Sequence, residues 1–471
     1  MRRAERKKVD LGTGSVGRLM LRLAIPAVVA QVINMLYNLV DRMYVGTIPE
    51  IGTDALAGLG VCFPLIMVVS AFAALIGNGG APLAAIRLGE GNREEAEKIL
   101  NNGVVLLFGL GAVLTAVLLI FSEPLLRAFG SPDTSLPYAD AYFRIYAVGT
   151  LFVLFSLGLN VFISCQGFSV MSMVTVIIGA VLNIALDPLF IFVFDMGVRG
   201  AAVATVISQA WSCAFVTAFL CSKRSGIRIR PRLFGLNFRL VGRTLALGVS
   251  PFVMQATESA VQIVFNIQLY AYTDGSKVYS AAMTIMMSVL QMVTLPLNGL
   301  GTGVQPLISF NFGAGKFDRI KKAVKYLFCC TFTLCGLMWL LCLLWPGLFA
   351  AVFSATEEVT AVVTAYMPFF MGGCIFFSAQ SAFQNTFLAL GQARISIFLA
   401  LLRKVILLIP LTFVLPLFLG VQGIFLAESV SDTLAGLCTA LTFALSIRRI
   451  LKKRAALLAQ GGNDLAPEEA K

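Results

Sequence analysis

The chain has 471 residues, of which 58% are hydrophobic and only 13% are charged. A membrane-spanning helix needs roughly 20 apolar residues, so this composition allows about a dozen spans and leaves no room for a soluble catalytic domain. The sequence contains no histidine, which excludes histidine metal sites and histidine proton relays, and its ten cysteines form no CxxC pair.

Twelve long apolar stretches predict an all-α integral membrane protein with 12 transmembrane helices. Their expected bounds are 17–44, 56–86, 97–122, 138–163, 168–194, 198–222, 242–271, 277–308, 320–348, 362–388, 393–418 and 421–447. The unbroken apolar runs argue against an outer-membrane barrel, whose strands alternate apolar and polar residues.

The loops between these stretches alternate in charge. Basic residues gather before the first stretch, between the sixth and seventh, before the ninth and after the last, whereas the other loops carry acids such as Asp133, Asp195 and Asp274. Because positively charged loops stay in the cytoplasm, we expect a multi-pass protein of the cell membrane with both termini in the cytoplasm. The net charge of +12 is then a consequence of topology, and no nucleic-acid partner is expected.

The two halves of the chain resemble each other at an offset of 222 to 225 residues. Pro82 corresponds to Pro306 and Tyr142 to Tyr366, and further pairs keep nearly the same spacing. This 6+6 internal repeat predicts two six-helix bundles related by a pseudo-twofold axis along the membrane normal, as in transporters whose halves rock about a central cavity. The expected parts are an N-terminal cytoplasmic segment 1–16, an N-lobe 17–222, a hinge-like cytoplasmic linker 223–241, a C-lobe 242–447 and a cytoplasmic tail 448–471, polar and disordered toward its end.

Ionisable residues inside the first half suggest a cation site. A charged group at bilayer depth costs at least ~2.5 kcal/mol, so its presence needs a reason. Asp41 lies late in the first stretch, Asp187 lies one helical turn after Asn183 in the fifth, and Thr205 lies in the sixth. If these three helices pack together, two carboxylates, an amide and a hydroxyl form an oxygen-rich pocket that suits Na⁺ or a shared proton.

Each of these residues also has a structural interpretation. Asp41 can form an ion pair with its neighbour Arg42, Asp187 can end a helix before Pro188, and Thr205 can be an ordinary helix-packing hydroxyl. Contacts between the three helices decide between the two interpretations.

The second half keeps little of this set. Asn266 stands at the repeat position of Asp41, and the other candidates for contacting substrate or a proton are Glu258, Lys404 and Glu428. Glu428 with Lys404 or Arg403 is expected to form a buried pair that is only structural. Glu258 has no neighbouring cation in the sequence, so it is the better candidate for contacting a cationic substrate or for carrying a proton.

A methionine stripe lies on the eighth stretch. Met283, Met286 and Met287 recur at helical spacing, and flexible methionine side chains suit a promiscuous apolar cavity. Ordinary helix packing explains the same pattern.

Several short motifs, taken in order, resemble the multidrug and toxic compound extrusion (MATE) family over about residues 15–448. They are Pro26 with the run Asp41-Arg42-Met43-Tyr44-Val45-Gly46, the segment 183–188, the segment 200–205, and Pro251 with Glu258. The resemblance implies a secondary active antiporter that exports lipophilic, often cationic compounds in exchange for H⁺ or Na⁺, by alternating access between two lobes.

The resemblance also assigns roles to residues. It places the family's N-lobe cation site on Asp41, Asn183, Asp187 and Thr205, as a candidate Na⁺ site, and the family's span-seven acid on Glu258. The acid that some members carry in span ten has no match, because this stretch holds Gln380, Gln384 and Asn385.

The expected partners are small lipophilic or cationic substrates and membrane lipid, and we expect a monomer without a cofactor other than the coupling ion. The alternative function is a lipid or lipid-linked oligosaccharide flippase of the same superfamily, which would need basic groups in its cavity to meet pyrophosphate. An integral-membrane enzyme is not expected, since the sequence has no histidine and no cluster of acids on the cytoplasmic side.

Overall fold

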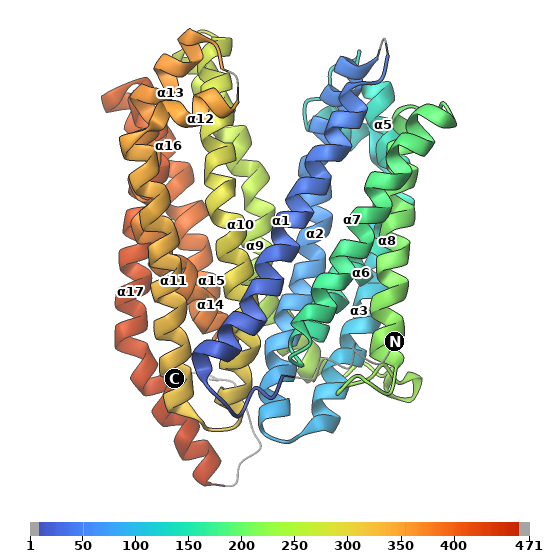
Figure 1. The fold of residues 1–471 in the computed structure, drawn as a ribbon, viewed down its shortest axis with the longest axis vertical. Helices are drawn as coiled ribbons and strands as arrows, with labels where there is room; N and C mark the ends of the chain where they lie inside the picture. The colour runs from blue at the N-terminus through green and yellow to red at the C-terminus, as the bar shows by residue number, and fades with distance from the viewer. Residues whose placement is uncertain (1–8, 50, 354, 461–471) are drawn as a thin grey trace.

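The fold is all-helical, and its helices form two bundles that stand side by side (Figure 1). The computed structural model describes residues 9–49, 51–353 and 355–460, and no β-strand occurs in these ranges. The first half of the expected N-terminal segment and the end of the expected tail lie outside the described residues.

The N-lobe is built from helices α1 to α8. These are α1 Val16–Gly46, α2 Gly52–Gly89, α3 Arg93–Ile120, α4 Ser122–Ala128, α5 Leu136–Val148, α6 Thr150–Ser164, α7 Ser169–Pro188, the π-helical segment η1 Leu189–Val193, and α8 Val198–Cys221. A single 3₁₀ turn, η2 Pro231–Leu233, lies in the connection to the second lobe.

The C-lobe is built from helices α9 to α17. These are α9 Phe238–Tyr272, α10 Lys277–Gly313, α11 Phe317–Leu344, α12 Pro346–Val352, α13 Glu357–Phe370, α14 Cys374–Ala389, α15 Ala393–Leu401, the π-helical segment η3 Leu402–Leu408, α16 Ile409–Leu419, and α17 Val421–Ala459.

The helices supply the twelve predicted spans. Nine spans are long and apolar enough by themselves, and two bent pairs, α5 with α6 and α13 with α14, bring the number to eleven. The twelfth is α9, which is 35 residues long but too polar to qualify by composition. The predicted fold class, an all-α multi-pass membrane protein with two six-helix bundles, is confirmed.

The internal repeat is visible in the helix bounds. α3 and α11 are both 28 residues long and begin at Arg93 and Phe317, and the bent pairs turn by 57° in the N-lobe and 51° in the C-lobe. Gly197 and Gly420 precede α8 and α17 with φ of 52° and 58°, a left-handed conformation that L side chains rarely adopt. The breaks before the last span of each half therefore require glycine.

The lobes contact each other through four helices, α1, α2, α9 and α10. The contact lies in the half of each helix at the end of the molecule where the two chain termini lie. α2 packs against α9, where Gly79 lies opposite Thr244 and Gly248, and a Cβ atom at Gly248 would overlap the carbonyl of Leu75. Phe72 and Phe252 pack with ring centroids 4.9 Å apart farther along the same two helices.

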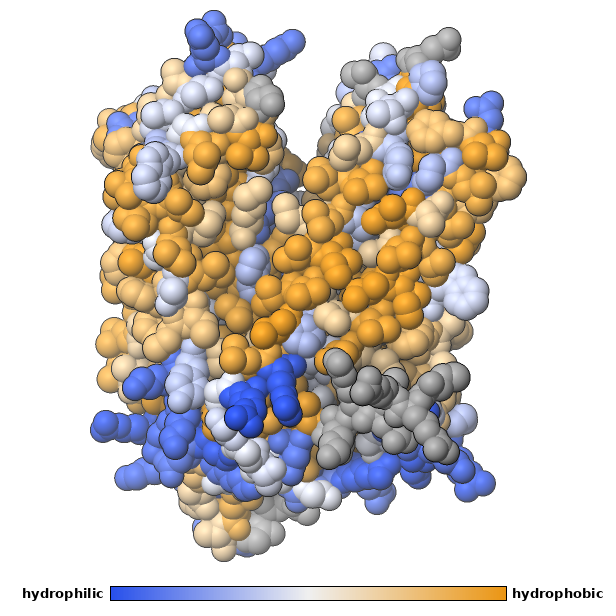
Figure 2. Space-filling view, in the orientation of Figure 1, coloured by the Kyte–Doolittle hydropathy of each residue, from blue (hydrophilic) through white to orange (hydrophobic). Residues whose placement is uncertain are grey.

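A second contact between the lobes joins α1 and α10. Gly299 and Gly303 form a GxxxG pair, and Cβ atoms there would lie 2.6 Å from the Cα atoms of Val28 and Ala24. Small residues allow helix backbones to approach closely, which is how helices pack in lipid where the hydrophobic effect is weak. At the opposite end the lobes separate, and Figure 2 shows a deep notch between them.

The described part of the expected linker, 223–241, is not a free hinge throughout. Gln166 of the N-lobe accepts hydrogen bonds from the Ser225 hydroxyl at 3.1 Å and the Ile227 backbone N–H at 3.0 Å. Asn101 of α3 donates to the Arg228 carbonyl at 3.0 Å and accepts from the Arg230 N–H at 2.8 Å. The first half of the linker is therefore part of the N-lobe, and the remainder leads to α9 at Phe238.

The last helix extends past the expected boundary at residue 447. α17 does not end there but continues to Ala459, and Arg454 is only 3% exposed. Arg454 also donates to the carbonyls of Phe312 and Gly313 at 3.3 Å each, which fixes the helix extension against the end of α10. The start of the expected tail is thus a folded part of the C-lobe.

Candidate functional site

Three packed helices bring the N-lobe site residues together. α1 packs against α7, and α7 packs against α8, so Asp41, Asn183, Asp187 and Thr205 share one interior region. Asp187 is 0% exposed, and Asn183 and Asp41 are also buried. The convergence on which the predicted cation site depends is present in the fold.

Asn183 is the centre of this group. Its Nδ2 atom donates to Asp187 Oδ1 at 3.2 Å and to Thr205 Oγ1 at 3.4 Å. Asp41 lies close enough to Asp187 for their charges to interact. Two carboxylates in one buried region repel each other, so the pair favours binding of a proton or a metal cation.

Three buried side-chain oxygens without hydrogen-bond partners within the described ranges also indicate that this region binds a proton or a cation. Asp41 Oδ1, Asn183 Oδ1 and Asp187 Oδ2 are buried and have no hydrogen-bond partner among the described residues. Buried polar atoms in proteins almost always have a partner. Because all three are acceptors, the missing partner is a donor or a cation, which fits a protonated carboxyl group or Na⁺ with oxygen ligands.

The structure gives little support to a purely structural role for Asp41, as the ion-pair partner of Arg42, or for Asp187, as a residue that ends its helix. The guanidinium of Arg42 lies 4.5 Å from the centre of the Phe63 ring, where a cation–π contact engages it. The helix does not end at Asp187, because α7 includes Pro188 and continues into η1. Single π-helical turns are frequently found at functional sites.

Two tyrosines belong to this region and were not predicted as site residues. Tyr37 is half-buried near Asp41 and Asp187, and Tyr142 is buried near Thr205. The spacing of Tyr37 and Asp41, one helical turn, was an available signal. The packing of α5 against α8, which brings Tyr142 to Thr205, has no signature in the sequence.

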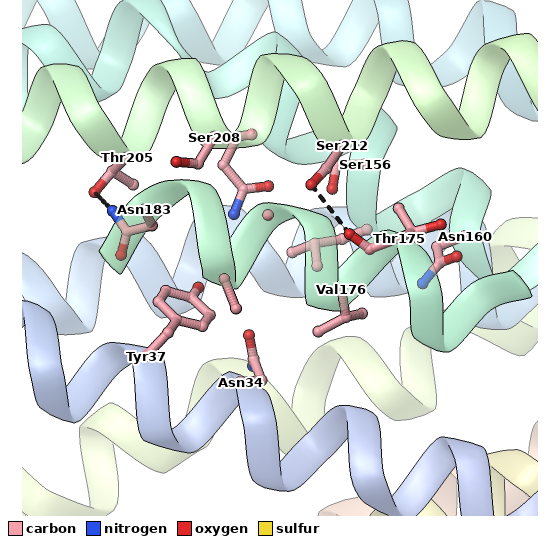
Figure 3. A pocket seen from close by; sticks show the side chains of 14 residues that line it. Asn34, Tyr37, Ser156, Asn160, Thr175, Val176, Asn183, Thr205, Ser208 and Ser212 are labelled. Carbon is pink, nitrogen blue, oxygen red and sulfur yellow. Dashed lines mark hydrogen bonds between the residues drawn. The ribbon is translucent and has the colours of Figure 1, made fainter. Parts of the chain in front are cut away.

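A polar cavity extends from Asn183 and Thr205 between α1, α6, α7 and α8 (Figure 3). It is lined by amide and hydroxyl groups, and its far part contains Asn160 and Ser212, whose hydroxyl donates to the Thr175 carbonyl at 3.4 Å. Asn160 Oδ1 and Gln209 Oε1 are buried there without a described partner. Amide and hydroxyl groups therefore extend from Asn183 along α7 as far as Thr175.

The C-lobe contains a buried charge cluster around η3, which presents Arg403 and Lys404. Arg403 donates to Asp432 Oδ1 at 2.6 Å and to Glu428 Oε1 at 3.1 Å, and it lies 4.1 Å from the centre of the Phe377 ring. Of the two expected cations, Arg403 is therefore the direct partner of Glu428, and it also pairs with Asp432, one helical turn after Glu428.

Glu258 has a cationic partner that its sequence neighbourhood does not reveal. Lys404 Nζ lies 3.0 Å from Glu258 Oε2. The Lys404 side chain is 4% exposed, whereas that of Glu258 is 42% exposed. A half-exposed carboxylate inside a span does not face hydrocarbon, so Glu258 faces the notch between the lobes. Lys404, which is distant in the sequence, is therefore the cation beside Glu258.

The remaining C-lobe candidates lie elsewhere. Asn266 is exposed on α9. Met283 and Met286 are buried in the hydrophobic core of the C-lobe, and Met287 packs against that core. Their positions agree with the helix-packing interpretation of the methionine stripe.

A second ion network, absent from the sequence predictions, joins the lobes at the end that carries the termini. Arg454 of α17 pairs with Glu90 at the end of α2. Arg87 binds Glu90 at 2.7 Å and Glu95 at 2.9 Å. Arg87 is 3% exposed. The repeat alignment could not reveal this network, because Arg454 lies beyond the expected last span.

The segment before α1 is also held by the other lobe. Asn311 donates to the Leu11 carbonyl at 2.9 Å, Lys316 to the Gly12 carbonyl at 2.7 Å, and Arg319 to the Gly14 carbonyl at 2.7 Å. The described end of the N-terminal segment is thus docked on the C-lobe.

Two repeated helical lobes, a notch between them and buried acids at the depth of the membrane define a membrane transporter and not an enzyme. The chain belongs to the MatE family, whose model matches residues 26–189 and 252–414. The two matched segments fall one in each lobe, which agrees with the internal repeat.

Curated relatives and solved structures are similar to this chain over most of its length. The multidrug export protein MepA of Staphylococcus aureus (strain MSSA476) is 22% identical over 432 residues, which cover 90% of this chain and 93% of that protein. MepA of Staphylococcus haemolyticus (strain JCSC1435) is 22% identical over 419 residues, covering 89% and 91%.

Among solved structures, a MATE protein in the bent conformation superposes with a TM-score of 0.88 at 22% identity, covering 95% of this chain and 99% of that one. The outward-facing conformation of a multidrug resistance MATE family transporter of the MOP superfamily gives a TM-score of 0.87 at 22% identity, covering 94% and 98%. These similarities establish the fold.

Proposed function

We propose that this protein is a secondary active antiporter that exports lipophilic cationic compounds in exchange for H⁺ or Na⁺. The observation that carries the proposal is the buried pair of Asp41 and Asp187 beside Asn183 and Thr205, whose unpartnered atoms are all oxygens. The curated relatives are named multidrug export proteins, which supports small-molecule export as the activity.

The N-lobe group is the proposed coupling site. A proton on Asp41 or Asp187, or a Na⁺ ion among the carboxylate, amide and hydroxyl oxygens, would relieve the repulsion between the two acids. Its binding would change the packing of α1 against α7 and so bias the two conformations of the transporter.

The proposed substrate contact is Glu258, the carboxylate that faces the notch. A carboxylate attracts the cationic groups of lipophilic amines, and the apolar lobes on both sides accept the rest of such a molecule. No cofactor and no second subunit enter the proposed cycle, and we propose that a single chain works as a monomer in the lipid bilayer.

The proposed cycle is alternating access. The loops with the most basic residues lie at the end with the termini, and Figure 2 shows hydrophilic side chains gathered there. By the positive-inside rule this end is cytoplasmic, so the notch opens outward in this conformation.

The test is ethidium export by the full-length protein reconstituted in proteoliposomes. Asp187→Asn and Asp41→Asn should each reduce gradient-driven export at least tenfold, because neither amide can exchange a proton or neutralise a cation. The matched control is Asp54→Asn, which removes an exposed acid in the first turn of α2. Full export in both N-lobe variants would reject the coupling site.

The coupling ion is found by driving wild-type export with a pH gradient alone and with a Na⁺ gradient alone. A response to neither gradient would reject the antiporter.

The flippase alternative finds no support in the site. Arg403 and Lys404 are the deep cations of the C-lobe, and carboxylates engage both of them. They are therefore not available to bind a pyrophosphate group.

A further inference from the structure

The buried cluster of the C-lobe contains more acid than base. Glu258, Glu428 and Asp432 face Arg403 and Lys404, so full ionisation leaves one negative charge inside the membrane. An uncompensated charge at this depth is costly. One proton bound by the cluster removes that charge.

The geometry indicates which oxygen takes this proton. Arg403 satisfies Glu428 Oε1 and Asp432 Oδ1, and its own carbonyl accepts from the Ser431 hydroxyl at 2.8 Å, which fixes the arginine. Glu428 Oε2 is buried without a partner among the described residues. A neutral carboxyl group on Glu428 would place its proton on that atom.

Lys404 interacts with both glutamates, directly with Glu258 and through its charge with Glu428. The other titratable groups near the cluster are the Cys374 thiol on α14, beside Asp432, and Tyr366 on α13, stacked on Phe425. Arg403 is held by its bonds to Glu428 and Asp432. Among the described residues, Lys404 is therefore the cation that can pair with either glutamate.

We propose that Lys404 is a relay that exchanges one substrate cation for one proton in the C-lobe. When an ammonium or other organic cation binds Glu258 from the notch, Lys404 is released and moves to Glu428. Glu428 then loses its proton to water, and Lys404 keeps its charge throughout. In the reverse direction, protonation of Glu428 returns Lys404 to Glu258 and expels the cation.

The conformation described here has Lys404 on Glu258, which is the arrangement that the proposal assigns to the proton-bound cluster. The proposal rests on the antiport function and adds to it a second proton site and a positioning residue, Lys404. Glu258 touches the substrate, whereas Lys404 acts through Glu258.

The test is ethidium binding to the full-length protein in detergent, in an Asp41→Asn/Asp187→Asn background so that the N-lobe acids release no proton. Fluorescence gives the dissociation constant at a series of pH values, and a pH-sensitive dye in weak buffer counts protons released. Exchange of one proton predicts affinity that rises about tenfold per pH unit while Glu428 titrates, with about one proton released per ethidium bound.

Glu428→Gln and Lys404→Gln should both abolish proton release and flatten the pH dependence. Lys404→Gln should also tighten binding, because no internal cation competes for Glu258. The matched control is Arg394→Gln, an exposed cation on α15, which should behave as its parent. Thermal unfolding of each variant verifies that it is folded.

Proton release that persists in Lys404→Gln would overturn the relay, as would binding in the parent without proton release. These results leave the antiporter intact if wild-type export still follows an ion gradient. Loss of gradient-driven export in the wild type would reject the antiporter itself, whatever the binding data show.

Discussion

Arg454, near the end of the last helix, forms a buried ion pair with Glu90, at the end of the second helix of the other lobe. The two residues are 364 positions apart in the chain. They join the lobes at the end where the lobes are in contact, opposite the notch. In the proposed alternating-access cycle, this pair holds closed the end of the molecule that must open toward the cytoplasm.

Glu90→Gln should weaken this closed side. Arg454 keeps two carbonyl partners, but it loses its charge partner in a buried setting, which costs about 3–5 kcal/mol in comparable ion pairs. We expect hydrogen exchange at the ends of α2 and α10 to become at least tenfold faster in the full-length protein. The measurement is hydrogen–deuterium exchange with mass spectrometry in lipid nanodiscs.

The control for this variant is Glu94→Gln. Glu94 pairs with Lys98 on the surface, and its side chain is 74% exposed, so its loss should leave exchange unchanged. Equal exchange in the Glu90 variant and the wild type would show that the Arg454 pair does not hold the lobes together.

A larger side chain at Gly248 should separate the lobes. Gly248→Val places carbon atoms against the Leu75 backbone of α2, and backbone cannot move aside as a flexible side chain can. We expect lower thermal stability in detergent and ethidium export reduced at least tenfold. Gly242→Val is the comparison, since a Cβ atom there meets nothing within 4 Å on the same helix.

Removing Arg403 should destabilise the C-lobe strongly. Arg403→Met leaves Glu428 and Asp432 without their cation, a loss of about 3–5 kcal/mol for a broken buried ion pair. Thermal unfolding of the purified protein should show this loss. The triple variant Arg403→Met/Glu428→Gln/Asp432→Asn should recover much of it, because no buried charge is then left unpaired. A triple variant no more stable than Arg403→Met would contradict the charge explanation.

Asn101→Ala should release the first half of the linker from the N-lobe. The variant loses the bonds to the Arg228 carbonyl and the Arg230 N–H, and buried groups left unsatisfied cost about 1–3 kcal/mol. We expect faster trypsin cleavage after Arg228 and Arg230.

Asn102→Ala serves as the neighbouring control for the linker. The Asn102 amide nitrogen is buried without a described partner, so its removal breaks no bond to the linker. If both variants are cut at the wild-type rate, the linker is held by other contacts.

The fold was predictable from the sequence because long apolar runs indicate membrane spans. The internal repeat then divides these spans into two sets of six. The contact between Asn183 and Asp187 was also predictable, since the two residues share a helix face at a spacing of four residues. The Lys404–Glu258 pair was not, because helices from distant parts of the chain meet only through tertiary packing. The continuation of α17 past residue 447 could not be predicted for a related reason. The basic residues there are typical of a solvent-exposed tail, and only tertiary packing shows that Arg454 is buried against its partners.

The docking of residues 11–14 on the C-lobe gives α1 an unusual mechanical position. Ser15 leads directly from this docked segment into α1, the helix that carries Asp41. Any rotation of the C-lobe relative to the N-lobe must therefore either pull on the start of α1 or detach the segment from Arg319 and its neighbours. In both cases the chain connects the moving lobe directly to the helix of the proposed cation site.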